Sequence, residues 1–142
     1  MRDFFGGEFD AVFAEFARRT RPGRFEPNAD VALSEDGEAV VVTVEIAGAE
    51  PNELRVMTED QLLYIMGRRV DRARDGRGSL LMKEIDYGEF AKKIRMPVPI
   101  SYEDATASYH DGMLTIRLPI STDALVPRNR TEVRMIVKRI PV

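Results

Sequence analysis

Residues 105–118 read ATASYHDGMLTIRL, two short runs of alternating side chains on either side of Asp111-Gly112. In each run, small or apolar residues occupy every second position, which is the period of a strand with one buried face. Glycine adopts a positive φ at little cost, so Asp-Gly between two such runs is typical of a hairpin turn. This stretch therefore predicts two antiparallel strands joined by a tight turn.

The same pattern recurs towards the N-terminus. Val40, Val42, Val44 and Ile46 alternate with other side chains, and Asp36-Gly37 marks a turn before them. Shorter apolar runs follow at 54–56, 62–66 and 90–96, separated by turn-like or polar residues. Short strands interrupted this often indicate an antiparallel β-sandwich, and no long helical pattern competes with them. We therefore expect an all-β fold.

The N-terminal residues 1–26 form a separate zone, rich in phenylalanine. Phe5, Phe9, Phe13 and Phe16 recur at the spacing of one helix face, which predicts a short helix with an apolar stripe. Rings of this size, together with Phe4, exceed the apolar area that a monomer normally leaves exposed. The stripe is therefore covered, either by the core of its own chain or in an assembly, and the pattern leaves both readings open. An acidic polar side argues against a membrane-surface helix.

Two other segments lack a core-forming pattern. The connection between Gly67 and Phe90 holds five arginines within 68–79 and then the apolar run Leu80–Ile85. We expect this run to be an extra strand that pairs with an exposed sheet edge on another chain. The last zone, 120–142, ends in Ile140-Pro141-Val142, whose two β-branched residues around a proline predict an extended plug for an apolar groove.

Composition excludes several classes of function. A net charge of −3 disfavours a nucleic-acid-binding protein, and the arginine-rich loop lacks aromatic residues for base stacking. There is no cysteine, and the lone His110 precedes a glycine turn. No glycine-rich phosphate loop or carboxylate cluster of calcium-loop spacing is present in the sequence. We therefore expect no enzyme, cofactor or metal site. No membrane span or export signal is visible, so we expect a cytoplasmic protein.

Three motifs in order resemble the small heat shock proteins of the α-crystallin (Hsp20) family. Residues 107–114 match the signature A-x-x-x-(N/D)-G-x-L. Residues 44–49 are similar to "v-e-l-P-G-v", with Ala47 in place of proline, and Tyr87–Phe90 followed by Met96-Pro97 is similar to "y-G-x-F…l-P". The resemblance covers about 28–119. It implies an immunoglobulin-like α-crystallin domain over 27–119, between the helical arm 1–26 and an extended tail 120–142.

The resemblance also implies a function. Family members are stress-response chaperones that bind partly unfolded client proteins without ATP and suppress their aggregation, as dynamic oligomers of dimers. The Phe-rich arm is then the client-binding segment, formed by Phe4, Phe5, Phe9, Phe13 and Phe16. The alternative is a p23-like sandwich, a co-chaperone or adaptor that binds one defined partner. No nucleic acid and no obligatory membrane are expected in either case.

The long connection resembles the bacterial and plant branch, in which a strand from this loop is exchanged between the subunits of the dimer. Lys92 stands where an arginine is usual, and it keeps the charge but not the bidentate fork of an inter-subunit pairing. Whether tails bind within or between dimers stays open. The resemblance places strand exchange at Leu80, Leu81, Met82, Lys83, Glu84 and Ile85, the tail plug at Ile140, Pro141 and Val142, and its groove at Leu54, Val56, Ala105 and Ala107.

Overall fold

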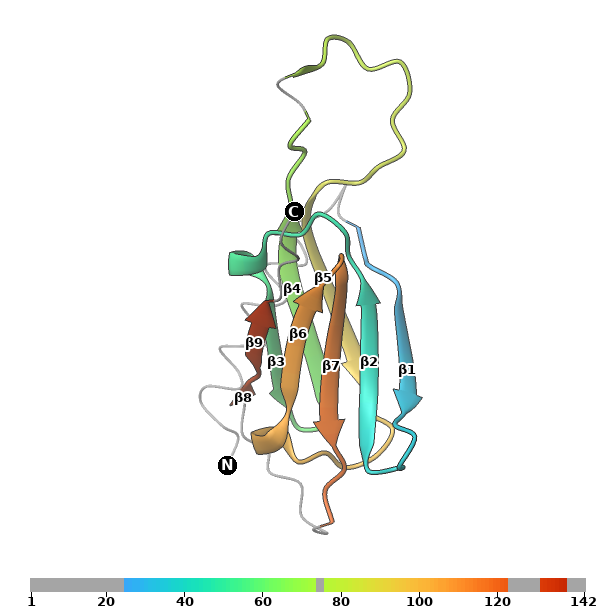
Figure 1. Cartoon of the computed structure of the whole chain (residues 1–142), viewed down its shortest axis with the longest axis vertical. Coiled ribbons are helices and arrows are strands. Elements are labelled where there is room, and N and C mark those ends of the chain that lie inside the picture. The colour runs from blue at the N-terminus through green and yellow to red at the C-terminus, as the bar shows by residue number, and fades with distance from the viewer. Residues whose placement is uncertain (1–24, 74–75, 123–130, 138–142) are drawn as a thin grey trace.

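The computed structural model of the chain describes residues 25–73, 76–122 and 131–137. Within these ranges the strands form two sheets that face each other as a sandwich (Figure 1), which confirms the predicted all-β fold. Two single-turn 3₁₀ helices, η1 (Pro51–Glu53) and η3 (Tyr102–Asp104), precede strands. The described strands are β1 (Ala29–Leu33), β2 (Ala39–Glu45), β3 (Arg55–Glu59), β4 (Leu62–Arg69), β5 (Gly88–Arg95), β6 (Thr106–His110), β7 (Met113–Pro119), β8 (Thr131–Glu132) and β9 (Arg134–Val137).

The strand order separates the chain into a five-stranded and a four-stranded sheet. The five-stranded sheet runs β1-β2-β7-β6-β9, and the four-stranded sheet runs β5-β4-β3-β8. All described pairs are antiparallel except β6 with β9. The short strands β8 and β9 follow each other in sequence but extend different sheets, so the chain passes from one sheet to the other between them (Figure 1).

The core lies between the sheets, where the period-2 residues face inward. On β2, Val40, Val42 and Val44 are fully buried, and Val42 lies opposite the equally buried Ile116 of β7. From the other sheet, Phe90 packs so closely over Gly67 that a Cβ at this glycine would lie 2.3 Å from the ring. Burial of each such side chain contributes about 1.5–3 kcal/mol, so the core accounts for the alternation seen in the sequence.

The signature turn is a two-residue hairpin between β6 and β7. Asp111 and Gly112 have φ values of 54° and 77°, the type I′ geometry that matches the twist of paired strands. Gly112 is needed for a second reason, because a Cβ there would lie 3.0 Å from the Cα of Ala47. The carbonyl oxygen of Gly112 accepts a hydrogen bond of 2.8 Å from the N–H of Ile46. The hairpin prediction at this turn is therefore confirmed.

Two buried tyrosines have hydroxyl groups in opposite situations. The hydroxyl of Tyr109 donates to the carbonyl oxygen of Ile46 at 2.8 Å and accepts from the N–H of Ala49 at 3.2 Å. Tyr102 is only 4% exposed, and its hydroxyl has no hydrogen-bond partner within the described ranges. Burial, with a smaller contribution from the charge of Asp60, raises the pKa of Tyr102 to about 12. The Tyr109 hydroxyl thus stabilises the backbone of the loop at residues 46–49, whereas burial of the Tyr102 hydroxyl without a partner costs free energy of folding.

We predict opposite effects for the two Tyr→Phe variants. Tyr109→Phe removes the hydroxyl that bonds to Ile46 and Ala49 and leaves these two backbone groups with only their long mutual hydrogen bond of 3.4 Å, so it should lower the free energy of unfolding by about 1–3 kcal/mol. Tyr102→Phe removes an unsatisfied group and should leave that free energy unchanged or raise it. Urea unfolding of both variants measures the difference, and equal losses would contradict this assignment of the hydroxyl groups.

Alkaline pH gives a second comparison of the same variants. The folded state keeps Tyr102 protonated above the ordinary pKa of 10.0, so this residue should make the wild type lose stability as pH rises from about 10 towards about 12. Tyr102→Phe should lack that part of the loss.

Candidate functional site

The four predicted groove residues lie where the two sheets meet along β3 and β6. Leu54 directly precedes β3 and Val56 lies on it, whereas Ala105 directly precedes β6 and Ala107 lies on it. All four are buried in the hydrophobic core of the sandwich. Their role in lining a groove stays a prediction.

A segment of the same chain pairs with both strands that carry the predicted groove residues. Val133 lies between β8 and β9, is 4% exposed, and donates its N–H to the carbonyl oxygen of Val56 at 2.8 Å. β8 pairs with β3, and β9 pairs with β6 in parallel, so residues 131–137 lie along both walls (Figure 1). An ion pair of 3.6 Å between Arg55 and Glu132 adds to the pairing with β3. We call residues 131–137 the groove segment.

The groove segment lies within the predicted extended tail, 120–142, but its pairing with β3 and β6 was not predicted. The sequence contains an apolar run at Val133–Val137, but its partners lie on strands that are distant in the chain. Short β-strands depend on the strand beside them rather than on their own propensity, so the run alone does not predict pairing. The predicted plug and client-binding arm lie outside the described residues, namely Ile140, Pro141, Val142, Phe4, Phe5, Phe9, Phe13 and Phe16.

A long loop, residues 70–87, extends from the ends of β4 and β5 beyond the sandwich (Figure 1). Arg69 closes its base, because its Nε and Nη2 donate to the carbonyl oxygen of Asp86 at 2.9 and 2.6 Å. Its Nη1 donates to the carbonyl oxygen of Ala47 at 3.2 Å. The guanidinium also lies 4.2 Å from the ring centre of Phe25, the first described residue. Arg69 thus holds both ends of the loop and the entry of the N-terminal arm at one point.

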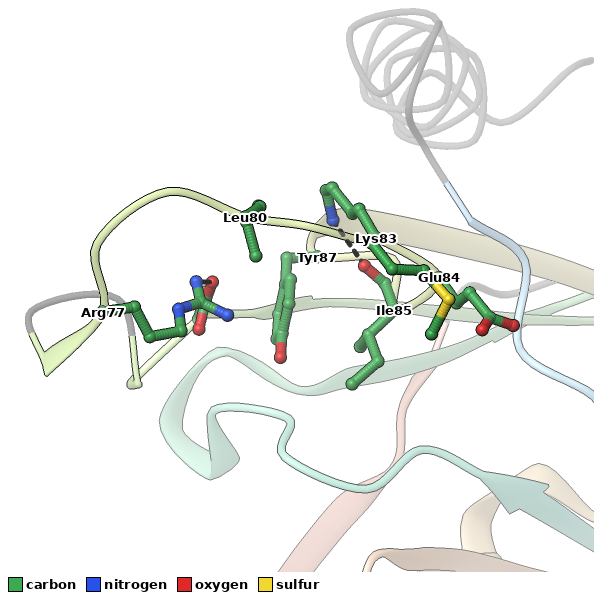
Figure 2. A pocket seen from close by; sticks show the side chains of 8 residues that line it. Arg77, Leu80, Lys83, Glu84, Ile85 and Tyr87 are labelled. Atoms are coloured by element: carbon green, nitrogen blue, oxygen red, sulfur yellow. Dashed lines mark hydrogen bonds and ion pairs between the residues drawn. The ribbon is translucent and has the colours of Figure 1, made fainter.

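The predicted exchange segment, Leu80–Ile85, forms no strand in the single chain. All six of its residues are exposed, and Leu81 is 99% exposed. Figure 2 shows Leu80, Ile85 and Tyr87 around a hollow inside the loop, where Lys83 Nζ donates to the carbonyl oxygen of Ile85 at 2.6 Å. Apolar side chains exposed together to this extent are typical of an interaction surface.

Three arginines in the loop or at the end of β4 are paired with acidic side chains. Arg68 lies 3.1 Å from Glu53, Arg72 pairs with Glu50, and Arg77 pairs with Asp71. The pairing lowers the net positive charge that this loop presents.

β1 is an edge strand with outward backbone groups and exposed apolar side chains, a surface that was not predicted from the sequence. The N–H of Glu45 donates to the carbonyl oxygen of Asn28, and the N–H of Ser34 donates to that of Ala39. Because paired and outward-facing residues alternate along an antiparallel strand, the backbone groups of Ala29, Val31 and Leu33 point away from β2. The side chains of Val31 and Leu33 are 45% and 62% exposed. The apolar residues at every second position, 29, 31 and 33, were the sequence signal that could have predicted this strand.

Lys92 lies on β5, and its Nζ is 3.4 Å from Glu26 Oε1. This ion pair links β5 to the segment that enters β1; the predicted pairing of Lys92 across a dimer stays a prediction. In the part of the chain that the structure describes, no group of three or more His, Asp or Glu side chains is placed to hold a metal ion. None of the described helices is long and apolar enough to cross a membrane.

Comparison with known proteins gives concordant results for sequence and structure. The model of the Hsp20/alpha crystallin family matches residues 32–136, which include most of the sandwich and of the groove segment. Small heat shock protein C4 of Rickettsia felis is 26% identical over 116 residues, which cover 78% of this chain and 70% of that protein. Heat shock protein 16 of Schizosaccharomyces pombe is 29% identical over 100 residues, covering 69% and 68%.

Solved structures agree with the fold. Heat shock protein 16.0 from Schizosaccharomyces pombe superposes with a TM-score of 0.65 at 25% identity, over 76% of this chain and 83% of that one. A small heat-shock protein from Xylella fastidiosa gives a TM-score of 0.59 at 24% identity, over 74% and 94%. The second similarity concerns the fold alone.

Proposed function

This chain belongs to the Hsp20/alpha crystallin family, and on that basis we propose that it is an ATP-independent holdase chaperone that works as a dynamic oligomer of dimers in the cytoplasm. Members of this family are chaperones, generally not enzymes. The observation that carries the proposal is the pair of exposed apolar surfaces at β1 and in the loop 70–87. Non-directional burial of apolar surface also accounts for binding of varied partly unfolded clients.

The dimer forms by exchange of Leu80–Ile85 onto β1 of the partner. The outward N–H and C=O groups of Ala29, Val31 and Leu33 offer a ladder to an added strand, and the exchange segment supplies six residues of extended length. Leu81, almost fully exposed in the single chain, becomes buried in such a pairing. Arg69 keeps the base of the loop fixed while its tip reaches the partner.

The oligomer forms through the groove between β3 and β6. Ile140 and Val142 of a neighbouring dimer enter the groove, and each contributes about 1.5–3 kcal/mol by burial. Ordering the tail costs roughly 1–2 kcal/mol per residue, so a single contact is weak and several act together. The groove segment already covers this site in the single chain, with Val133 buried beside Val56. Tail binding between dimers therefore displaces it, which favours exchange of subunits.

The Phe-rich arm provides the client-binding surface. The stripe of Phe5, Phe9, Phe13 and Phe16 has the spacing of one helix face and no charged residue on it. Opening of the weak tail contacts frees subunits whose arms then bind exposed apolar segments of clients. No nucleotide is needed, and the sequence has no phosphate-binding loop.

For the dimer, we predict that Val31→Pro abolishes dimerisation without unfolding the sandwich. Proline removes an N–H that points away from β2, so the bonds between β1 and β2 remain. Native mass spectrometry should show monomers and circular dichroism an unchanged β signal. Val31→Thr keeps the N–H and serves as the control. A Val31→Pro protein that still forms dimers would show that β1 is not the exchange edge.

For the oligomer, we predict that deletion of Ile140–Val142 reduces the native mass from a many-subunit species to dimers, because each neighbour loses its plug. Native mass spectrometry measures this change, with Arg139→Ala as a control that leaves the plug intact. An unchanged mass would contradict the role of the tail. A protein that remains small even with its tail and protects no client would instead favour the p23-like adaptor.

The Val133→Ala variant tests whether the tail of a neighbouring dimer displaces the groove segment. Loss of two methyl groups weakens the groove segment by about 1–2 kcal/mol, so the neighbouring tail binds better and subunit exchange slows. Exchange is measured by mixing isotopically labelled and unlabelled oligomers. Dissociation to dimers would mean that Val133 supports the assembly rather than competing with its tail.

For client binding, we predict that deletion of residues 1–24 weakens suppression of heat-induced client aggregation, because the apolar stripe is lost. Light scattering of a heat-denatured client measures suppression, with and without ATP, and ATP should change neither protein. The sandwich should remain folded, since Phe25 and all strands are retained. Full residual suppression would exclude the arm as the client-binding segment.

A further inference from the structure

Two strands of the four-stranded sheet, β3 and β4, are buried on both faces. In β2 and β7, buried residues alternate with more accessible ones, as in a strand with one buried face. In β3, four consecutive residues are buried, and in β4 five are. Consecutive side chains point to opposite faces, so the outer face of β3 and β4 is also covered.

The outer face carries its own apolar cluster. Val56 and Ile65 are partners in the β3–β4 register and belong to the core, so the next pair, Met57 and Tyr64, points outward. Met66 and Ala91, partners across β4 and β5, point the same way. These four outward residues are between 2% and 8% exposed and form a cluster separate from the core, with Leu62 at its margin. We call this cluster the outer seat.

The described hydrophobic residues of the outer seat all come from β3, β4 or β5, so no other described element packs an apolar side chain on this face. An apolar layer over the seat would come from outside the ranges 25–73, 76–122 and 131–137. Residues 1–24 are the longest such stretch and contain five of the seven phenylalanines.

The arm enters at the β5 edge of the sheet. Phe25 forms a bridge with Phe90 of β5, with 5.3 Å between the ring centres, and both side chains pack on the core side. The next residue on β5, Ala91, points to the outer face and belongs to the seat, so the entry lies at the edge of the seat. Glu26 is held to Lys92 on the same strand. Three strands span about 10 Å, whereas a helix of three turns is about 16 Å long, so an arm that starts at β5 is long enough to cross the seat.

The charges around the seat complement the predicted helix of the arm rather than the arm as a whole. Arg55, Lys93 and Arg95 are exposed on the outer face and outnumber its acidic residues Glu59 and Glu89, and Lys93 Nζ lies 5.7 Å from the ring centre of Tyr64. Within residues 5–16 the sequence has Glu8, Asp10 and Glu15 and no basic residue, whereas the arginines of the arm lie outside that stretch. Two methionines also suit aromatic partners, because the thioether is polarizable and adapts its shape to a ring edge.

We propose that the outer face of β3, β4 and β5 is the resting seat of the Phe-rich arm of the same chain. The arm then exchanges between this seat and clients, and its release uncovers the seat as a second apolar surface. The exchange of the arm between seat and clients rests on the proposed role of the arm in client binding, whereas the existence of the seat does not. Each chain thereby shields its own client-binding stripe until a client competes for it.

The absence of cysteine makes the seat testable by cross-linking in the full-length protein. One cysteine replaces Ala17 in the arm, and a second replaces Lys93 beside Tyr64. Arg117→Cys, exposed on β7 of the other sheet, is the matched control position, and Ala124→Cys replaces Ala17 to test the connection 123–130 as the cover. A bis-maleimide with a reducible spacer joins the two thiols, and denaturing gels distinguish links within one chain from links between chains.

We expect cross-links within one chain between positions 17 and 93 to form about tenfold faster than those between 17 and 117, since the seated arm raises the local concentration of its thiol. The double substitution Phe9→Ser and Phe13→Ser should remove this preference. Three results would each overturn the proposed seat. They are equal cross-linking rates of position 17 with positions 93 and 117, cross-links only between chains, and a higher cross-linking rate of position 124 with position 93 than with position 117.

Client protection separates this proposal from the proposed function. The linked protein should suppress client aggregation no better than the protein without residues 1–24, and reduction of the spacer should restore suppression. Efficient linking with full suppression would leave the seat in place and refute the client role of the arm. If no cross-link forms but deletion of residues 1–24 still removes suppression, the seat is refuted and the client role of the arm remains.

Discussion

Backbone hydrogen bonding at open sheet edges is the constraint on which this molecule depends. A sheet that does not close leaves a row of N–H and C=O groups at each edge, and such a row pairs with any extended chain that reaches it. The chain covers two of these edges itself, because β8 pairs with β3 and β9 with β6. β1 keeps its outward groups, with no described strand beside it. The dimer and the oligomer proposed above both complete edges, which explains why an assembly is possible without a large preformed interface.

Features set by neighbours in sequence were predictable. Asp111-Gly112 encodes its own turn, because both residues adopt a positive φ that few other pairs tolerate. The alternation from Val40 to Ile46 predicts a strand with one buried face, and the alternating residues Val40, Val42, Val44 and Ile46 are all fully buried. Leu54, Val56, Ala105 and Ala107 were named through a family resemblance; all four are buried in the core, and their role as a groove stays a prediction.

Features set by distant partners were not predictable. Val133 is buried because Val56, 77 positions earlier by residue number, accepts its N–H, and nothing in the local pattern of 131–137 indicates this partner. Arg69 looked like one of five loop arginines, yet its contacts are to Phe25, Ala47 and Asp86. The outer seat was hidden for a related reason. Consecutive apolar residues in β3 and β4 are consistent with any strand buried on two sides, and the sequence does not say which layer covers the second side.

Arg69 has a consequence for how loops of this kind change length. Its hydrogen bonds to the carbonyl oxygen of Asp86 fix the two ends of residues 70–85 against each other. The entropy lost on closing a chain grows only with the logarithm of its length, so doubling the number of residues between fixed ends costs only about 0.6 kcal/mol. Insertions and deletions between Val70 and Ile85 would therefore change the reach of the proposed exchange segment with little effect on the stability of the sandwich. If the dimer forms as proposed, the spacing of its subunits is adjustable independently of the folded core.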